Sequence, residues 1–172
     1  MKNTTSIIIF LGVLIATSPV YAGCNSNITP TKPSSIYTDN GDGTVTDSQT
    51  NLMWNKCLLG LSGDTCASGT LENLTWQAAL KATNDSSLNG HSDWRLPNKN
   101  ELISIIEVAC TAPAINETSF PGTPTGGGYW ASSPSLQQDA YAWYTNGGKV
   151  AHDFVKDKNN NQFYVRLVRD HK

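Results

Sequence analysis

The sequence predicts an α+β domain in which antiparallel strands near both ends of the chain enclose two helices. Short runs of β-branched and aromatic residues, separated by Asn-Gly and Asp-Gly turns, occur around residues 37–54 and again after residue 129. Between them, residues 74–83 and 97–109 place apolar side chains at helical spacing. Strands joined by tight turns pair antiparallel, and helices confined to the middle of the chain are typical of α+β rather than alternating α/β folds.

The first 22 residues have the pattern of a secretory signal peptide. Lys2 provides a positive start, residues 7–16 form an uninterrupted apolar run, and "VYA" supplies small residues before a cleavage point. The run is shorter than the roughly 20 residues that cross a membrane. We therefore expect an exported protein, periplasmic, surface-held or secreted, with no transmembrane segment, a lead-in over 23–35 and a single domain over 36–172.

Without the signal peptide, the chain keeps 150 residues and a formal charge of −3. A chain of this length forms one domain with an adequate core. The small negative charge gives no reason to expect a nucleic-acid partner.

All four cysteines follow the signal peptide, and an even number in an exported chain predicts two disulfides. Three pairings are possible. Cys57 and Cys66 flank a short loop and are the natural local pair, which would leave Cys24 to bond Cys110. Alternatively, Cys24 carries lipid, because "AGC" resembles a lipoprotein cleavage site, although Tyr21 stands where such a site has an aliphatic residue.

The stretch "YTDNGDGTVTD" resembles a calcium loop because Asp39, Asp42 and Asp47 lie among glycines. In the register of an EF-hand loop, however, Thr38 and Gln49 occupy the first and last positions, where charged ligands are needed. Asn-Gly and Asp-Gly tolerate the positive φ of a tight turn without any metal. We therefore predict a hairpin, no metal site, and strands over 37–39, 44–47 and 52–54.

The two predicted helices carry recognisable start signals. Thr75 can cap the first helix, while Asn98 and Glu101 form a capping-box pattern at the start of the second. One face of the first helix is marked by Trp76, Ala79, Leu80 and Thr83. The buried stripe expected in the second helix consists of Leu102, Ile105, Ile106 and Ala109.

The segments that flank the second helix have clear roles. In "SDWRLP", Trp94 and Leu96 are expected in the core, with Arg95 paired internally to hold the corner before the helix. Residues 111–128 contain three prolines and a "GGG" and are expected to be a long irregular region. The strands predicted beyond it are 129–133, 140–145, 149–155 and 163–169.

No hydrolytic motif or phosphate-binding loop is present, and we expect no cofactor and no catalytic residue. The candidate ligand-binding surface instead combines tyrosines on outward strand positions with basic residues. Amphipathic rings and charge-assisted hydrogen bonds suit an anionic glycan. The candidate residues are Tyr141, Tyr144, Lys149, Lys156, Lys158 and Arg166.

The residues together resemble the Lcl C-terminal domain family, a bacterial exported family named after part of a collagen-like adhesin. The resemblance spans residues 37–169 and rests on "DNGDGTVTDSQTNLMW", the cysteine pair, "TWQAAL", "SDWRLPNKNEL", "PAIN", "FP", "YWASS", "AWY" and "VRLVR". It implies a C-type lectin-like fold. Cys24 and Cys110 also resemble extra cysteines in a disulfide-bearing branch of the family.

Two functions are compatible with this resemblance. The first is a non-enzymatic binding or adhesion module that recognises a glycan or a surface protein; the lectin motifs for calcium and sugar, "EPN" or "QPD" with "WND", are absent. The alternative is an enzyme, because "RLPNKNE" also resembles the formylglycine-generating-enzyme branch of related folds. Its polar site would be assembled from His91, Asp93, Arg95 and His152.

Overall fold

The computed structural model describes residues 23–84, 86–133, 141–146, 149–154 and 162–171. The predicted signal peptide therefore lies outside the described residues. Within those residues, no helix combines the length and the apolar character needed to cross a membrane.

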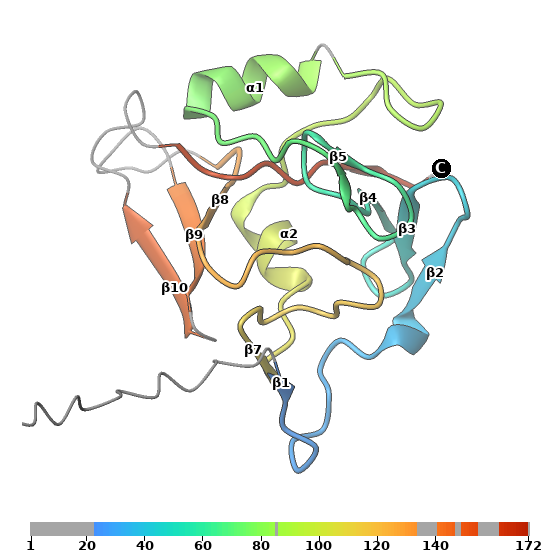
Figure 1. Cartoon of the computed structure of the whole chain (residues 1–172), viewed down its shortest axis with the longest axis vertical. Coiled ribbons are helices and arrows are strands. Elements are labelled where there is room, and N and C mark those ends of the chain that lie inside the picture. Colours follow the sequence, from blue (N-terminus) through green and yellow to red (C-terminus); the bar gives the residue numbers. More distant parts are fainter. Residues whose placement is uncertain (1–22, 85, 134–140, 147–148, 155–161, 172) are drawn as a thin grey trace, which may run out of the picture.

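The protein has an α+β fold, as the sequence predicts, with several antiparallel sheets and two helices (Figure 1). The largest sheet has the strand order β11-β4-β3-β2. Its strands are β2 (Tyr37–Asp39), β3 (Thr44–Asp47), β4 (Leu52–Asn55) and β11 (Val168–Asp170). Because β11 pairs with β4, the end of the chain lies against strands from its beginning.

The remaining strands form three smaller antiparallel sheets. One has the order β10-β9-β8, and the other two are the pairs β1-β7 and β5-β6. Their bounds are β1 (Gly23–Cys24), β5 (Leu61–Ser62), β6 (Ser68–Gly69), β7 (Cys110–Thr111), β8 (Gly128–Trp130), β9 (Tyr141–Asn146) and β10 (Lys149–Phe154). A 3-10 turn, η1 (Ser34–Ile36), leads into β2.

Both predicted helices are present, and each begins as expected. Helix α1 (Trp76–Asn84) starts after Thr75, whose hydroxyl accepts a hydrogen bond from the Ala78 N–H. Helix α2 (Lys99–Ser104) starts with a complete capping box between Asn98 and Glu101. In Figure 1, α1 covers the top of the molecule and α2 lies centrally between the two larger sheets.

Helix α2 is shorter than the sequence predicts, because it ends at Ser104 rather than at residue 109. Ile105, Ile106 and Ala109 are nevertheless buried, which confirms the prediction that this apolar stripe lies in the core. Beyond the helix, backbone groups find tertiary partners instead of helical ones: the Glu107 N–H donates to the Ala114 carbonyl. The prediction of a helix to residue 109 was wrong because such non-helical hydrogen bonds replace the i to i−4 pattern.

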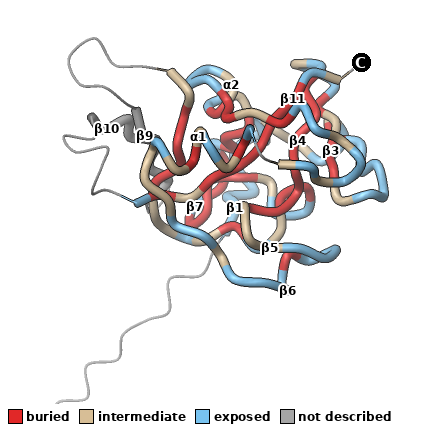
Figure 2. The backbone as a smooth tube through the Cα atoms, turned by 90° about the horizontal axis from the view of Figure 1, so that it is seen from above, coloured by how far each residue is buried: buried red, intermediate tan, exposed pale blue. Residues whose placement is uncertain are grey.

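The core consists of two packed clusters that extend through the centre of the molecule, while β5 and β6 lie at its exposed periphery (Figure 2). Trp54 and Phe120 pack edge to face in the first cluster, and Trp130 and Phe163 do so in the second. Trp94 and Leu96 are buried, as expected from the sequence. Burial of these large rings supplies much of the stability of a domain of this size.

The last predicted strand is mostly not a regular strand. Phe163 and Tyr164 make single bridges with Leu74 and Tyr129, and regular pairing begins only at Val168. The segment passes through the interior and contacts several elements in turn. The prediction of one strand over 163–169 is therefore corrected to short bridges followed by β11.

The two disulfides join Cys57 to Cys66 and Cys24 to Cys110, which is the pairing that the sequence favoured. The first closes a short loop beside β4, and the second ties β1 to β7. Because the sulfur of Cys24 is bonded to Cys110, it is not free to carry a thioether-linked lipid in this structure.

The capping box leads to a first prediction. We expect Asn98→Ala to lower the free energy of unfolding by about 1 kcal/mol, because the amide oxygen that accepts from the Asn100 and Glu101 N–H groups is lost. Chemical denaturation would measure the change. An unchanged unfolding midpoint would contradict a stabilising role for the cap.

Candidate binding groove

An open groove of about 650 Å³ lies beside the turn between β2 and β3. We call it the hairpin groove. Three segments form its walls: the turn at 41–43, the disulfide-closed loop with Glu72, and Leu88 with Asn89; Asn55 on β4 lies among them. The groove therefore includes the part of the sequence that resembles a calcium loop. Its other lining residues are Cys57, Leu59, Gly60, Leu61, Ser62, Gly63 and Asp64.

The first wall is shaped by side chains that hold the tight turn. Asp42 accepts hydrogen bonds from the N–H and the hydroxyl of Thr44, at 2.9 Å and 2.6 Å. Asp39 accepts from the Gly41 N–H and forms an ion pair with Lys56. Hydrogen bonding from Lys56, together with that from Gly41, lowers the pKa of Asp39. The acidic residues therefore serve the hairpin, as local turn chemistry predicts.

The absence of a calcium site nevertheless remains a prediction. The third acidic residue of the stretch, Asp47, is fully buried and accepts from the Gln49 N–H. Asp39, Asp42 and Asp47 thus each serve different partners. Calorimetry that detected micromolar calcium binding, abolished by Asp42→Ala, would contradict the prediction.

The second wall is the loop closed by Cys57 and Cys66. The backbone at Gly60 lies close against the backbone at Gly69 and the next residue, Thr70. A Cβ on Gly60 would lie only 2.1 Å from the Thr70 carbonyl oxygen. Gly60 also has a φ of +88°, which side-chain-bearing residues rarely adopt. The disulfide and this close backbone contact together position Ser62 and Asp64 along the groove.

The third wall contributes an amide network at the base of the groove. Asn89, in the tight turn before Trp94, donates from Nδ2 to Oδ1 of Asn55 at 3.0 Å. Asn55 is only 6% exposed, and this bond joins its amide to that of Asn89 across two segments. The hydrogen bond fixes the position of the Asn55 side chain at the base of the groove.

The charges that line the groove are all negative. Asp42, Asp64 and Glu72 are exposed carboxylates from three different segments. Among the described lining residues there is no lysine, arginine or histidine and no aromatic ring. The groove can therefore accept hydrogen bonds from hydroxyl or amino groups at its walls and donate one from Asn55. It is poorly suited to a phosphate, sulfate or carboxylate.

The structure contradicts one predicted ligand-binding residue. Arg166 is 1% exposed and donates from Nη1 to the carbonyl oxygens of Asn55 and Lys56, at 3.3 Å and 2.7 Å, and from Nη2 to the Thr123 hydroxyl at 2.9 Å. Its guanidinium lies 4.9 Å from the centre of the Phe120 ring. Arg166 is a structural residue and not part of a surface.

The burial of Arg166 has a simple physical origin. Its neighbours Val165, Leu167 and Val168 are also buried, so the segment has no solvent-facing side on which alternation could place a cation. Burial lowers the pKa of Arg166 to about 10, while nearby Tyr129 and Tyr37 oppose this shift. The side chain therefore stays charged at neutral pH, stabilised by carbonyl and hydroxyl oxygens.

The other predicted ligand-binding residues are not tested by the structure. The side chains of Tyr141, Tyr144 and Lys149 lie outside the described part of the molecule, although β9 and β10 pair antiparallel. Lys156 and Lys158 lie entirely outside the described residues. A basic face on this part of the chain remains a prediction.

The residues of the enzymatic alternative make separate contacts. Asp93 pairs with Arg169, at 2.6 Å to Nε. Arg95 forms a two-point ion pair with Glu101, at 2.7 and 2.8 Å, and contacts Asp170. The Glu101 hydrogen bonds raise the pKa of Arg95. His91 packs against Trp94, and the His152 side chain lies outside the described residues. Asp93 and Arg95 thus hold the strand-to-helix corner rather than share a cleft.

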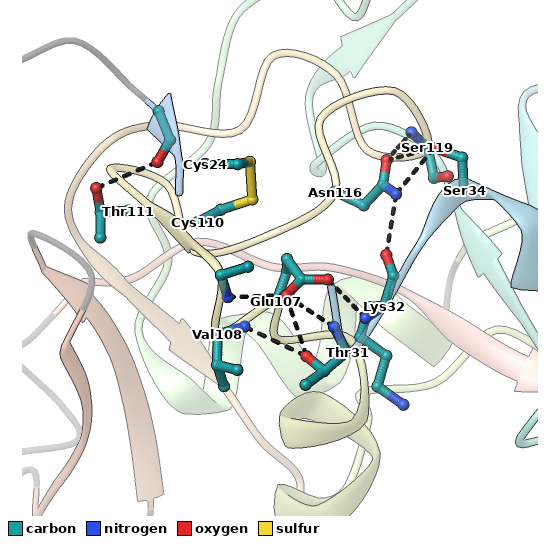
Figure 3. The surroundings of a disulfide bond; sticks show 12 residues. Cys24, Thr31, Lys32, Ser34, Glu107, Val108, Cys110, Thr111, Asn116 and Ser119 are labelled. Carbon is teal, nitrogen blue, oxygen red and sulfur yellow. Dashed lines mark hydrogen bonds between the residues drawn. A yellow bond between two sulfur atoms is a disulfide. The ribbon is translucent and has the colours of Figure 1, made fainter. Parts of the chain in front are cut away.

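Glu107 forms a second buried polar centre, close to the disulfide between Cys24 and Cys110 (Figure 3). Its carboxylate accepts from the Thr31 N–H and hydroxyl, the Lys32 N–H and the Ala109 N–H. Burial would raise the pKa of Glu107, but the backbone hydrogen bonds from Ala109, Thr31 and Lys32 outweigh it and lower the pKa. This carboxylate fastens the N-terminal lead-in to the domain.

The depressed pKa of Glu107 implies a pH-dependent stability. Its contribution is fully present above the unfolded-state pKa of about 4.3 and is lost as the pH falls through the lower folded-state value. We expect Glu107→Gln to reduce the free energy of unfolding at neutral pH and to flatten its loss below about pH 5. Denaturant unfolding across this pH range would measure both. The exposed Glu117→Gln serves as a control and should keep the wild-type pH profile.

These observations define the class of protein: a disulfide-crosslinked α+β domain with an open, acidic groove. The family model described as Lcl C-terminal domain matches residues 43–169. The match covers well over half of the chain, and the protein therefore belongs to the Lcl C-terminal domain family. A comparison with curated proteins finds no match.

No sequence pattern indicates a functional role for the groove residues Asn55, Asp64, Glu72 and Asn89. Each is polar and stands in an ordinary loop or strand end, so no local pattern distinguishes it. The available signal was the spacing of glycines and the cysteine pair, which indicated tight turns. Only the fold shows that three such turns meet around Asn55.

Proposed function

We propose that this protein is an exported, non-enzymatic binding module that recognises a glycan through the hairpin groove. The observation that carries the proposal is the groove itself, whose polar lining is built on rigid turns around the Asn55 amide. Sugar hydroxyls both donate and accept hydrogen bonds. Exposed carboxylates and a buried amide donor match that double capacity.

Export and the non-enzymatic character rest on separate observations. Two disulfides suit an oxidising compartment outside the cytoplasm, and the sequence begins with a signal-peptide pattern. The candidate catalytic residues Asp93 and Arg95 are engaged in ion pairs that hold the fold. These pairs favour the binding module over the enzymatic alternative.

The proposal can be tested with a glycan array probed by the oxidised mature protein, with and without calcium. We expect binding that does not require calcium and that Asp64→Arg abolishes, because the arginine would project into the groove. Glu117→Arg, which reverses an exposed charge outside the groove, should leave binding unchanged. Binding to no glycan, or equal binding by both variants, would refute a glycan site in the groove.

The anionic glycan expected from the sequence requires a different surface, because the acidic groove repels it. We propose that Tyr141, Tyr144, Lys149, Lys156 and Lys158 supply that surface; Arg166 does not contribute because it is buried. We expect the protein to bind heparin at low salt, elute in a salt gradient, and elute earlier when Lys156→Ala and Lys158→Ala are combined. Passage of the wild type straight through the column would show that this expectation is wrong.

A further inference from the structure

We propose that the disulfide between Cys24 and Cys110 is a site of reversible thiol–disulfide exchange with a dithiol reductant. Its reduction frees the start of the N-terminal strap, by which we mean residues 23–36, while the domain stays folded. Three features carry the inference: the accessibility of this disulfide, the exposure of the first residues of the strap, and a second fastening of the strap that contains no sulfur.

The two disulfides differ in their accessibility. Cys24 is exposed on β1, and both Cys24 and Cys110 line an open pocket of about 440 Å³ beside the strap. Cys57 borders the hairpin groove, but Cys57 and Cys66 are only 5% and 3% exposed. A reductant must reach a sulfur atom directly, so access controls the rate of exchange. We therefore expect the bond between Cys24 and Cys110 to be reduced first, from the side of the exposed Cys24.

The exchange takes place in two steps. A thiolate of the reductant attacks Sγ of Cys24, a bond forms between these two sulfur atoms, and the bond to Cys110 breaks. Cys110 leaves as a thiolate and takes up a proton from water. The second thiol of the reductant, once deprotonated, attacks the first and releases Cys24 as a thiolate, which is protonated in turn. Two electrons thus pass to the protein, and the reductant leaves as its own disulfide; the reverse sequence restores the bond.

The first part of the strap has little else to hold it. Residues 23–31 are all exposed, so they bury no apolar side chain against the core. The pairing of β1 with β7 involves only two residues on each strand. The hydrogen bond from the Asn25 N–H to the Ala109 carbonyl continues this pairing. A segment with so few buried contacts opens locally at low cost once the crosslink is cut.

The rest of the strap is held by side chains that a reductant leaves intact (Figure 3). The buried Glu107 carboxylate accepts hydrogen bonds from the Thr31 and Lys32 N–H groups, at 3.0 and 2.6 Å. Asn116 donates from Nδ2 to the Lys32 carbonyl and to the Ser34 hydroxyl. Opening therefore stops near Thr31, and the domain beyond it keeps its contacts.

Trapping of the released thiols tests the selectivity. The oxidised mature protein is incubated with dithiothreitol under native conditions, alkylated with N-ethylmaleimide at successive times, and mapped by mass spectrometry. We expect Cys24 and Cys110 to be alkylated at least about tenfold faster than Cys57 and Cys66. Circular dichroism should show native structure in the product, with a lower unfolding midpoint because a crosslink that constrained the unfolded chain is gone.

Hydrogen exchange locates the segment that is released. In the reduced protein, the amides of residues 25–28 should exchange faster than in the oxidised protein, while the Thr31 and Lys32 amides keep their protection. In the reduced state, Glu107→Gln should extend the fast exchange to Thr31 and Lys32, because one of the two acceptor oxygens becomes an amino group.

Matched variants separate the effect of the crosslink from that of the reductant. Cys24→Ser combined with Cys110→Ser should show the exchange pattern of the reduced protein without any reductant. Cys57→Ser combined with Cys66→Ser removes the other disulfide, and its strap should remain as protected as in the oxidised wild type.

Three results would overturn the inference. The first is alkylation of both disulfides at the same rate, or loss of native circular dichroism as soon as the first is reduced. The second is unchanged exchange of residues 25–28 in the reduced protein. The third is failure of the variant with Cys24→Ser and Cys110→Ser to fold, because the inference requires a folded domain without this crosslink. No readout here involves a glycan, so the inference and the proposed function stand or fall separately.

Discussion

Replacement of Arg166 by alanine is expected to lower the free energy of unfolding by about 3–5 kcal/mol, the largest effect of any single substitution considered for this protein. The change removes the donors to the Asn55 and Lys56 carbonyls. Each buried acceptor left without a partner costs about 1–3 kcal/mol. It also empties the space of a large, fully buried side chain beside Phe120, which adds a cavity cost, while the burial cost of the guanidinium charge disappears and offsets part of both losses.

Two further variants show whether the effect comes from the interior. Arg166→Met fills most of the space without making the hydrogen bonds, and we expect a loss smaller than that of alanine, because the cavity cost is largely avoided. Lys81→Ala removes an exposed cation on α1 and should leave the unfolding midpoint unchanged. Denaturant unfolding measures all three. A wild-type midpoint for Arg166→Ala with reduced ligand binding would contradict the structural role.

Removal of the disulfide between Cys24 and Cys110 is expected to lower the free energy of unfolding by about 4.6 kcal/mol on the loop-closure model, since the two cysteines are 86 residues apart in the sequence. The same model gives about 2.7 kcal/mol for Cys57 and Cys66, which are 9 residues apart. The long crosslink restricts far more of the unfolded chain, so its loss should be the more damaging.

The test compares Cys24→Ser with Cys110→Ser against Cys57→Ser with Cys66→Ser, each pair by denaturant unfolding of the oxidised protein. The predicted order is that the variant without the long disulfide is the less stable. The variant without the short disulfide should lose ligand binding more than stability, because that loop forms one wall of the groove. The reverse order of stability would contradict the loop-closure explanation.

The turn at residues 39–43 has a structural role and also forms part of the groove. Its acidic residues resemble calcium ligands in the sequence, yet they cap a hairpin and pair with neighbours. One of them, Asp42, also faces the groove and retains an oxygen that makes no hydrogen bond within the described structure. The same residues thus form the turn and supply part of the negative charge of the groove.

Several elements were determined by the sequence alone because their interactions are local. The hairpin of β2 and β3 has the predicted bounds, since Asn-Gly and Asp-Gly impose the turn. The capping box starts α2 at the predicted residue because Asn98 and Glu101 act on neighbouring N–H groups. The disulfide pairing followed from parity and from the short separation of Cys57 and Cys66.

Only the tertiary structure decided where α2 ends, what Arg166 does and where the groove lies. Each depends on groups that are distant in the sequence: Glu107 binds Thr31 and Lys32, and Arg166 binds carbonyl oxygens more than 100 positions earlier. Local propensities are worth tenths of a kcal/mol per residue, whereas a buried charged hydrogen bond is worth about 1.5–3 kcal/mol. Where the two compete, the long-range contact determines the structure.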